Sequence, residues 1–216
     1  MVPWKKYWKF FWDDNSTWSW ILNIVVFFIL IKFLLYPGFG LIVGTSYPVV
    51  AVMSESMDHS FLQLTTKPEL CGKFRENTGY VSMDDYWALC SDWYFENTNI
   101  TFEKWKEYSF NKGFSKGDIM FISGRKPEKI NIGDIIVFKA QGDYPIIHRV
   151  INKSFEEGQY VYATKGDHNS GSSPWVHENH ITEDRIMGVA YFRLPYLGYI
   201  KLAFAWFLGL FGLQVI

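Results

Sequence analysis

The chain has 216 residues, enough for one domain with its own hydrophobic core and additional membrane segments. Its formal net charge is −1, so there is no overall positive charge that would favour nucleic-acid binding. Two cysteines, Cys71 and Cys90, are too few for a multi-disulfide scaffold or a four-cysteine zinc module. They are expected either to form one disulfide in an oxidising compartment or to be two buried thiols.

A membrane-spanning helix is predicted over residues 18–36. The stretch WSWILNIVVFFILIKFLLY is long enough to cross the hydrocarbon core and contains a single charged residue, Lys32. Lys32 lies within one turn of the end of this stretch, where its amine can reach the headgroups. Pro37 and Gly38 follow directly and are expected to end the helix.

The segments at the two ends of the chain also favour a membrane location. Residues 1–17 alternate tryptophans with lysines, which predicts an amphipathic helix on the membrane surface, with a disordered basic tail as the alternative. After the span no Lys or Arg occurs before Lys67, so the positive-inside rule places the N-terminus in the cytoplasm and the body outside. Residues 197–216 are predominantly apolar, with Lys201 as their single charged residue, and are expected to form a second anchor, with an interfacial helix as the alternative.

The body between the anchors is predicted to be mainly β. Residues 114–196 contain runs such as GDIIVFKA and PIIHRVINKS, rich in β-branched and aromatic residues and separated by Gly-Asp or Pro, which indicates antiparallel strands. Residues 61–113 have aromatics at irregular helical spacing and predict a partly helical insertion. The insertion follows a membrane-proximal strand within residues 37–60. The sequence contains no phosphate-binding loop or dinucleotide fingerprint.

Two serines follow the apolar run VVAVM, which predicts a nucleophile beside a hydrogen-bond donor. On an extended segment Ser54 and Ser56 point to the same side. Ser56 is the candidate nucleophile, and its own backbone N–H and the Ser54 hydroxyl are the candidate oxyanion donors. A turn or capping role for the two serines is the alternative. The run itself is expected to bind substrate as an added strand, through Val49, Val50, Ala51, Val52 and Met53.

A candidate base and a candidate acid come later in the chain. His148 lies in the apolar strand PIIHRVI, where a buried imidazole needs a hydrogen-bond partner, so it is either the base or a satisfied core residue. Arg149 should then face the other way, toward solvent. Asp167 in TKGDHN either orients the imidazole or caps its own turn, and Asp184 is the alternative acid.

Three further histidines, His168, His177 and His180, raise the question of a zinc site. They lack an accompanying cysteine or carboxylate set of the kind that zinc sites use. We therefore expect neither a metal nor another cofactor.

Taken together, these segments resemble type I signal peptidases. The similarity covers about residues 18–60 and 112–216, and it is carried by S54-E55-S56-M57, GDIMFIS (117–123), INIGDIIVFKA (130–140), PIIHRVI (145–151), TKGDHN (164–169) and MGVAYFRLPYLGYI (187–200). Histidine stands in H-R-V where bacterial members have lysine, so the chain looks like the archaeal and endoplasmic-reticulum type. Glu55 departs from the family's usual glycine, and Ser173 stands where the family commonly has a second acidic residue.

The resemblance implies a membrane-bound serine endopeptidase that removes signal peptides from exported preproteins. Ser56, His148 and Asp167 would be its catalytic residues, and the lipid membrane, preproteins and possible accessory subunits its partners. The two-anchor layout favours an archaeal-type plasma membrane over the endoplasmic reticulum. The alternatives are a non-enzymatic, membrane-tethered β domain that binds a partner at the cell surface, and a serine–lysine autoproteolytic repressor, which would lack the anchors.

Overall fold

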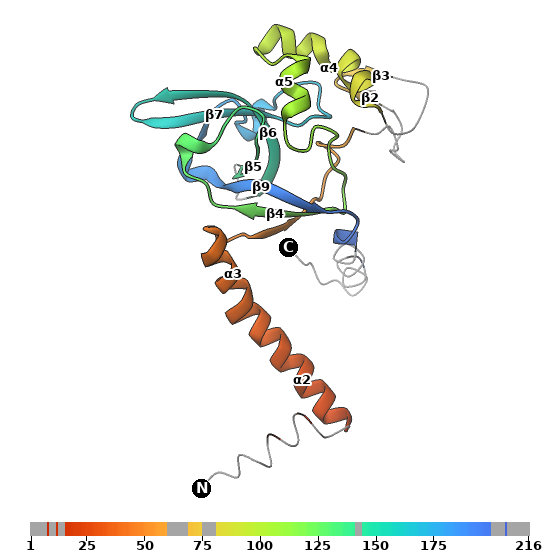
Figure 1. Cartoon of the computed structure of the whole chain (residues 1–216), viewed down its shortest axis with the longest axis vertical. Coiled ribbons are helices and arrows are strands. Elements are labelled where there is room, and N and C mark those ends of the chain that lie inside the picture. The colour runs from red at the N-terminus through yellow and green to blue at the C-terminus, as the bar shows by residue number, and fades with distance from the viewer. Residues whose placement is uncertain are drawn as a thin grey trace. The chain divides into compact units, whose positions relative to one another are not determined.

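A computed structural model describes residues 8, 12, 16–59, 69–74, 81–140, 144–199 and 206. The chain divides into two compact units, Met1–Pro48 and Val49–Ile216. The first contains a long helix and the second contains the strands (Figure 1). The predicted interfacial segment 1–17 and the predicted anchor 197–216 lie almost entirely outside the described residues.

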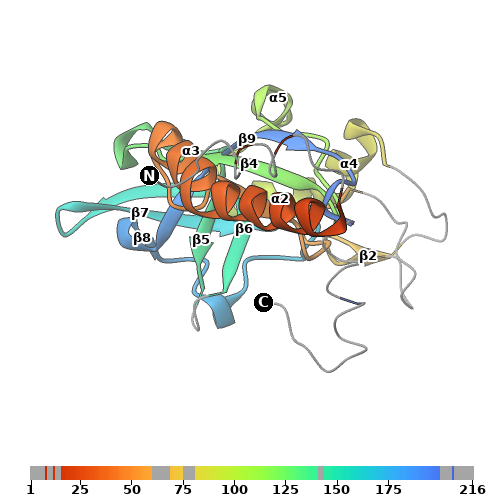
Figure 2. The ribbon, with the colours of Figure 1, turned by 90° about the horizontal axis from the view of Figure 1, so that it is seen from below.

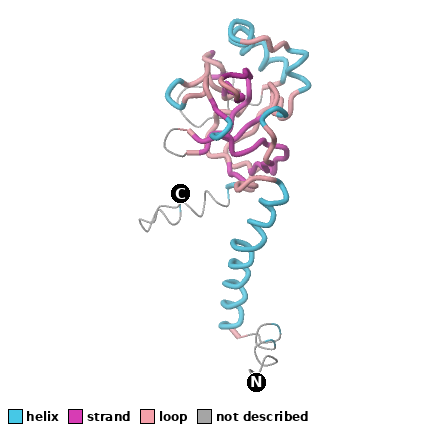
Figure 3. The backbone as a smooth tube through the Cα atoms, turned by 90° about the vertical axis from the view of Figure 1, so that its left-hand side faces the viewer, coloured by secondary structure: helices cyan, strands magenta, loops and turns pink. Residues whose placement is uncertain are grey.

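The helix of the first unit is continuous over Thr17–Val43. It consists of α2 (Thr17–Leu30), a π-helical turn η1 (Ile31–Leu35) and α3 (Tyr36–Val43), drawn in cyan in Figure 3. Ser16 caps its N-terminus by accepting a hydrogen bond from the Ser19 N–H, and Gly44 ends it with a φ of 73°. Within the described part of the chain, this is the one helix long and apolar enough to cross a membrane.

The expectation that Pro37 and Gly38 end this helix is wrong. Pro37 lies in the first turn of α3, directly after the π-helical turn. The Tyr36 N–H there donates to the carbonyl of Ile31, five residues back. Because this wider turn shifts the hydrogen-bond pattern, a residue without an N–H fits at the next position, as proline does at a helix start. The helix therefore extends beyond residue 36 to Val43.

The second unit is a mainly antiparallel β domain, which confirms the predicted fold class. Its seven-stranded sheet has the order β1-β4-β9-β5-β6-β7-β8, and Figure 2 shows β4 and β9 side by side. The strands are β1 (Val49–Ala51), β4 (Ile119–Ser123), β5 (Ile135–Lys139), β6 (Pro145–Glu156), β7 (Gln159–Lys165), β8 (Ile181–Thr182) and β9 (Ile186–Leu194). Short 3-10 turns η2 (Pro127–Lys129), η3 (Pro174–Val176) and η4 (Glu183–Arg185) connect some of them.

The sheet curls so that β6 faces the segment that follows β1, although the two strands are not neighbours in the sheet order. Ile147 of β6 packs against a core cluster that contains Val52 and Met57, from just after β1. β6 pairs with β5 in a register that sets His148 opposite Ile136. The curl is what brings residues distant in sequence to one place.

The insertion is partly helical, as expected, and it covers the outer face of β6. It contains a hairpin of β2 (Glu69–Leu70) and β3 (Lys73–Phe74), followed by α4 (Met83–Asn97) and α5 (Phe102–Glu107). The side chains of Ser82 and Thr101 cap the two helices. An aromatic cluster including Tyr86, Tyr94 and Trp105 packs against Ile151 of β6. The insertion thus shares a core with the sheet.

Cys71 and Cys90 form a disulfide that ties the β2–β3 hairpin to α4. This settles the alternative that the sequence left open. Closing a loop of this length lowers the entropy of the unfolded chain, so we expect reduction to lower the free energy of unfolding by about 3 kcal/mol.

The measurement is urea denaturation in detergent, followed by tryptophan fluorescence, with and without dithiothreitol. The Cys71→Ala/Cys90→Ala double variant is the matched control, because its midpoint should not respond to the reductant. Equal midpoints for the oxidised and reduced wild type would contradict the prediction.

Candidate active site

Ser56 and His148 lie within hydrogen-bond distance of each other. Ser56 sits in a turn closed by a hydrogen bond from the Asp58 N–H to the Glu55 carbonyl, and the neighbouring Met57 side chain is buried in the core. The Ser56 Oγ is 2.9 Å from the Nε2 of His148. The structure therefore brings the predicted nucleophile and base together, although 92 positions separate them in sequence.

The position of His148 follows from the alternation of side chains along β6. Its imidazole is buried on the same face as Val150, with the ring of Phe138 edge-on to it. The next residue, Arg149, consequently points to the opposite face. Because the imidazole is enclosed, both of its nitrogens need partners.

The second partner of His148 is Glu178. The Glu178 carboxylate is fully buried, and its Oε1 accepts a hydrogen bond from the His148 Nδ1. Its Oε2 accepts a hydrogen bond from the Ser173 N–H, at 2.6 Å. An ionised carboxylate can only accept, so a neutral His148 ring carries its proton on Nδ1 and leaves Nε2 to accept from the Ser56 hydroxyl.

Sequence reasoning missed Glu178. It is the one acidic residue between Asp167 and Glu183, and it comes shortly after Ser173, which stands where the family commonly has an acid. That spacing is the signal that would have identified it. The alternative acid, Asp184, is exposed in η4.

Asp167 does not contact His148, which corrects the expected role of this residue. Its buried carboxylate accepts hydrogen bonds from the Nε and Nη2 of Arg149, at 2.9 and 2.7 Å, and lies 3.0 Å from the Nε2 of His59. The physical reason is the alternation along β6: Asp167 lies on the Arg149 face and Glu178 on the His148 face.

The electrostatics of this cluster follow from its burial. Burial by itself would raise the pKa of Asp167, but the Arg149 guanidinium and the hydrogen bonds from His59 and Arg149 outweigh it. The net effect holds the pKa of Asp167 well below its usual range. Burial also lowers the pKa of His59.

Arg149 is fully buried, so the expectation that it faces solvent is wrong. The reason is the insertion, which covers this face of β6. The guanidinium donates to the carbonyls of Ser109, Phe110 and Gly133 and lies 4.5 Å from the centre of the Trp105 ring. Together with the Asp167 carboxylate, these acceptors and the aromatic ring compensate for the lost hydration of the cation.

Lys165 shares this covered face, since it pairs with Arg149 across β6 and β7. Burial lowers the pKa of Lys165 to about 8. Its ammonium donates to the Gly166 carbonyl at 3.1 Å and lies over the rings of Trp93 and Tyr94. The lysine therefore points into the insertion, on the opposite face of the sheet from His148.

The turn that carries Asp167 holds the backbone of the nucleophile. The His168 N–H donates to the Ser56 carbonyl at 2.9 Å, and the His168 Nδ1 donates to the Asp58 carbonyl at 2.8 Å. A Cβ at Gly166 would lie 2.7 Å from the Ser56 carbonyl oxygen and 2.9 Å from the His148 Nε2. Only glycine therefore fits at the point where this turn passes the Ser56–His148 pair.

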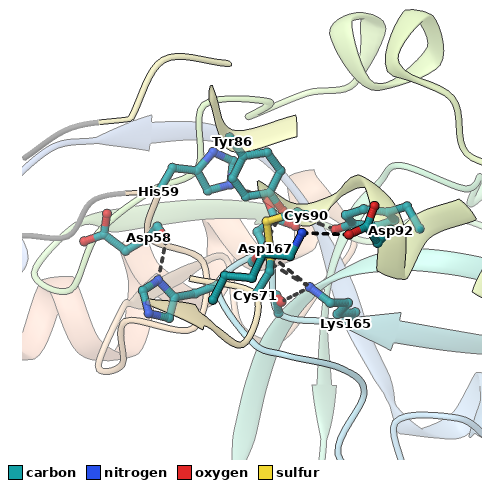
Figure 4. The surroundings of a disulfide bond; sticks show 12 residues. Asp58, His59, Cys71, Tyr86, Cys90, Asp92, Lys165 and Asp167 are labelled. Carbon is teal, nitrogen blue, oxygen red and sulfur yellow. Dashed lines mark hydrogen bonds and ion pairs between the residues drawn. A yellow bond between two sulfur atoms is a disulfide. The ribbon is translucent and has the colours of Figure 1, made fainter. Parts of the chain in front are cut away.

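The insertion in turn holds this turn in place, as Figure 4 shows around the disulfide. The Tyr86 hydroxyl donates to the Asp167 carbonyl at 2.9 Å, and the Cys71 N–H donates to the His168 carbonyl at 2.9 Å. The His59 ring stacks on Tyr86, with ring centres 3.9 Å apart. The insertion is thereby linked to Ser56 through one short turn.

The other predicted site residues surround Ser56. The Ser54 Oγ is exposed and lies 3.1 Å from the Ser56 Oγ. Along the expected substrate strand the side chains alternate: Val50 and Val52 face the core, Val49 and Ala51 are half-buried, and Met53 is exposed. β1 pairs with β4 along one edge and stands at the end of the sheet order.

The histidines at 168, 177 and 180 are among the described residues that could be tested for a metal site. Among the described residues, no group of three or more His, Cys, Asp or Glu side chains is arranged to hold a metal ion. The Asp167 carboxylate and the Arg149 guanidinium form a fully buried ion pair near the site.

A serine, a histidine and a buried carboxylate in consecutive hydrogen-bond contact form the nucleophile–base–acid arrangement of serine hydrolases. The comparison with known proteins is more specific. The chain is 32% identical over 99 residues to the signal peptidase complex catalytic subunit SEC11C of Homo sapiens and of Canis lupus familiaris, covering 44% of this chain and 52% of theirs. It is 28% identical over 120 residues to SEC11 of Colletotrichum graminicola, covering 50% of this chain and 70% of the relative.

These relatives confirm the similarity to signal peptidases that the serine and histidine segments predicted. The chain spans about half the length of the SEC11C relatives that it matches. No family model matches the chain.

Proposed function

We propose that this protein is a membrane-bound serine endopeptidase that cleaves signal peptides from exported preproteins through an acyl-enzyme intermediate. The observation that carries the proposal is the 2.9 Å contact between the Ser56 Oγ and the His148 Nε2, with the Glu178 carboxylate behind the ring. The similarity to catalytic subunits of the signal peptidase complex supports the substrate class. Accessory subunits are accordingly proposed as partners.

The proposed mechanism consists of two acyl transfers, and one proton passes through His148 in each. The Ser56 hydroxyl gives its proton to the His148 Nε2 as the Oγ attacks the scissile carbonyl. The Ser56 N–H and the Ser54 hydroxyl stabilise the negative oxygen of the tetrahedral intermediate. His148 then protonates the leaving amine, which becomes the N-terminus of the mature protein. His148 then takes a proton from a water molecule as the water oxygen attacks the acyl carbonyl. The ester bond to the Ser56 Oγ breaks, His148 returns the proton to that oxygen, and the signal peptide leaves with a free carboxylate.

Glu178, rather than Asp167, is proposed to orient His148. Its carboxylate accepts a hydrogen bond from the Nδ1–H and stabilises the positive ring that forms when the Nε2 accepts the serine proton. Asp167 is proposed as a positioning residue, because it is linked to the turn that holds the Ser56 backbone.

The substrate is proposed to bind as an extended strand along residues 47–53. The half-buried Val49 and Ala51 and the exposed Met53 supply apolar surface for the small side chains that precede a signal-peptide cleavage site.

The helix Thr17–Val43 is proposed to anchor the protein, with the N-terminus in the cytoplasm and the catalytic body outside an archaeal-type plasma membrane. The Cys71–Cys90 disulfide supports an oxidising, extracytoplasmic location for the body.

The test is incubation of the full-length protein in lipid vesicles with a membrane-inserted preprotein. N-terminal sequencing of the product should show cleavage after the signal peptide by the wild type and no product with Ser56→Ala. Binding of the preprotein by both forms, with cleavage by neither, would contradict the proposal and favour a non-enzymatic β domain.

Ser54→Ala is expected to lower kcat about 10²- to 10³-fold while KM changes little. The hydroxyl is 3.1 Å from the nucleophilic oxygen, and removing one oxyanion donor typically has an effect of this size. Single-turnover cleavage kinetics would measure it, with Ser54→Thr as the variant that keeps a hydroxyl. A kcat within about twofold of the wild type for Ser54→Ala would exclude this hydroxyl from the oxyanion hole.

A further inference from the structure

An open cavity of about 500 Å³ lies beside the proposed catalytic residues. Its lining consists of one loop and one residue of the β2–β3 hairpin: His168, Asn169, Ser170, Gly171, Ser172 and Ser173, together with Glu69. Apart from Glu69 and His168, these residues have no ionisable side chain. The cavity is therefore polar and has one carboxylate at its wall.

The loop that lines this cavity contacts the proposed site at both of its ends. At one end, the His168 N–H donates to the Ser56 carbonyl. The Nδ2 of Asn169 and the Nε2 of His148 both lie within 3 Å of the point where a Cβ on Gly166 would stand. At the other end, the Ser173 N–H donates to the Glu178 carboxylate. The cavity is thus built on the same loop that holds the nucleophile and the acid.

Ser56 lies between the proposed substrate-binding strand β1 and the loop that lines the cavity. β1 leads into Ser56 from its N-terminal side, whereas the loop is bonded to the carbonyls of Ser56 and Asp58, on the C-terminal side. A substrate chain that pairs with β1 and continues past the nucleophile therefore runs toward the cavity. In the substrate orientation proposed above, with the residues before the scissile bond along β1, the residues after the bond run toward the loop.

Glu69 supplies the one carboxylate in the described lining of the cavity. The half-buried Glu69 carboxylate makes no hydrogen bond or ion pair there. Lys73, the cation on the facing strand of the same hairpin, is already paired with Asp92 at 2.7 Å. A cationic side chain of a bound substrate would act as the counter-ion of the Glu69 carboxylate.

We propose that this cavity is a subsite for the substrate residues that follow the scissile bond, and that Glu69 makes it favour lysine or arginine there. The inference rests on the proposed peptidase function. An extended chain advances about 3.3–3.6 Å per residue, so the second and third residues after the bond are those that reach the loop. Their long basic side chains can extend to the hairpin that carries Glu69.

The experiment uses full-length protein in lipid vesicles and three preproteins that differ only at the second and third residues after the cleavage site, which are Lys, Gln or Glu. For the wild type, kcat/KM should be about three- to fivefold higher for the Lys substrate than for the Gln substrate, and lowest for Glu, as expected for a partly exposed ion pair. Glu69→Gln should remove the difference between Lys and Gln, and Glu69→Lys should reverse the order.

Glu96→Gln is the matched control, because Glu96 is an exposed acid on α4 of the same insertion. It should keep the wild-type order of the three substrates. Equal kcat/KM for all three substrates with the wild type, or an unchanged preference in Glu69→Gln, would overturn the subsite while leaving the peptidase function standing. Failure of the wild type to cleave any of the three would instead overturn the proposed function, and the subsite with it.

Discussion

Glu178→Gln is expected to lower kcat for preprotein cleavage about 10⁴-fold, the size of effect seen when the acid of a serine-protease triad becomes an amide. The Glu178 carboxylate accepts a hydrogen bond from the His148 Nδ1–H, which keeps the proton on Nδ1 and leaves the Nε2 free to accept from Ser56. A glutamine amide can present its NH₂ to the ring instead, which favours the tautomer with its proton on Nε2. It also removes the negative charge that stabilises the protonated imidazole.

Single-turnover kinetics with the vesicle-inserted preprotein would measure this loss. KM should change little, because Glu178 is buried behind the ring. Asp184→Asn is the control, since it makes the same chemical change at an exposed acid and should leave kcat as it is. A Glu178→Gln enzyme with a kcat within about tenfold of the wild type would remove Glu178 from the mechanism.

Asp167→Asn is expected to lower the free energy of unfolding by about 3–5 kcal/mol at neutral pH, as typically happens when one partner of a buried ion pair is removed. The variant leaves the fully buried Arg149 guanidinium without its counter-ion. It also changes the hydrogen bonding of His59. The measurement is urea denaturation of the full-length protein in detergent, with Asp184→Asn again as the exposed control.

The pH dependence identifies the cause of this loss. The folded-state pKa of Asp167 lies below its unfolded value of about 3.9, so the carboxylate stabilises the fold above that pH. The contribution is lost as the pH falls below about 4 toward the folded-state pKa. The difference in stability between the wild type and Asp167→Asn should therefore be constant from pH 5 to 7 and shrink below pH 4. A difference that stays the same down to pH 2 would contradict the ion-pair explanation.

The two acids thus have separable roles. Glu178 is expected to act on kcat with little change in KM, and Asp167 chiefly on stability, with any loss of activity following the displacement of the turn that holds Ser56. If catalysis were instead lost only in Asp167→Asn, and this variant were as stable as the wild type, Asp167 would be the acid that orients His148, as the sequence suggested.

The sequence by itself determined the features that depend on local pattern. The alternating and β-branched runs predicted the antiparallel body, the apolar stretch predicted the long helix, and the serine and histidine segments predicted the pair at Ser56 and His148. The first two follow from side-chain periodicity and composition, whereas the pairing of Ser56 with His148, 92 positions apart, followed from the resemblance of their segments to type I signal peptidases.

Only the tertiary structure decided which acid faces the histidine and what the insertion does. Alternation along β6 separates His148 from Arg149, but which acid meets each depends on the paths of the turn after β7 and of the loop before β8. The disulfide and the packing of α4 and α5 over Arg149 likewise involve contacts between distant segments. Such contacts arise when the sheet curls and buried charges must find partners, and no local pattern in the sequence records them.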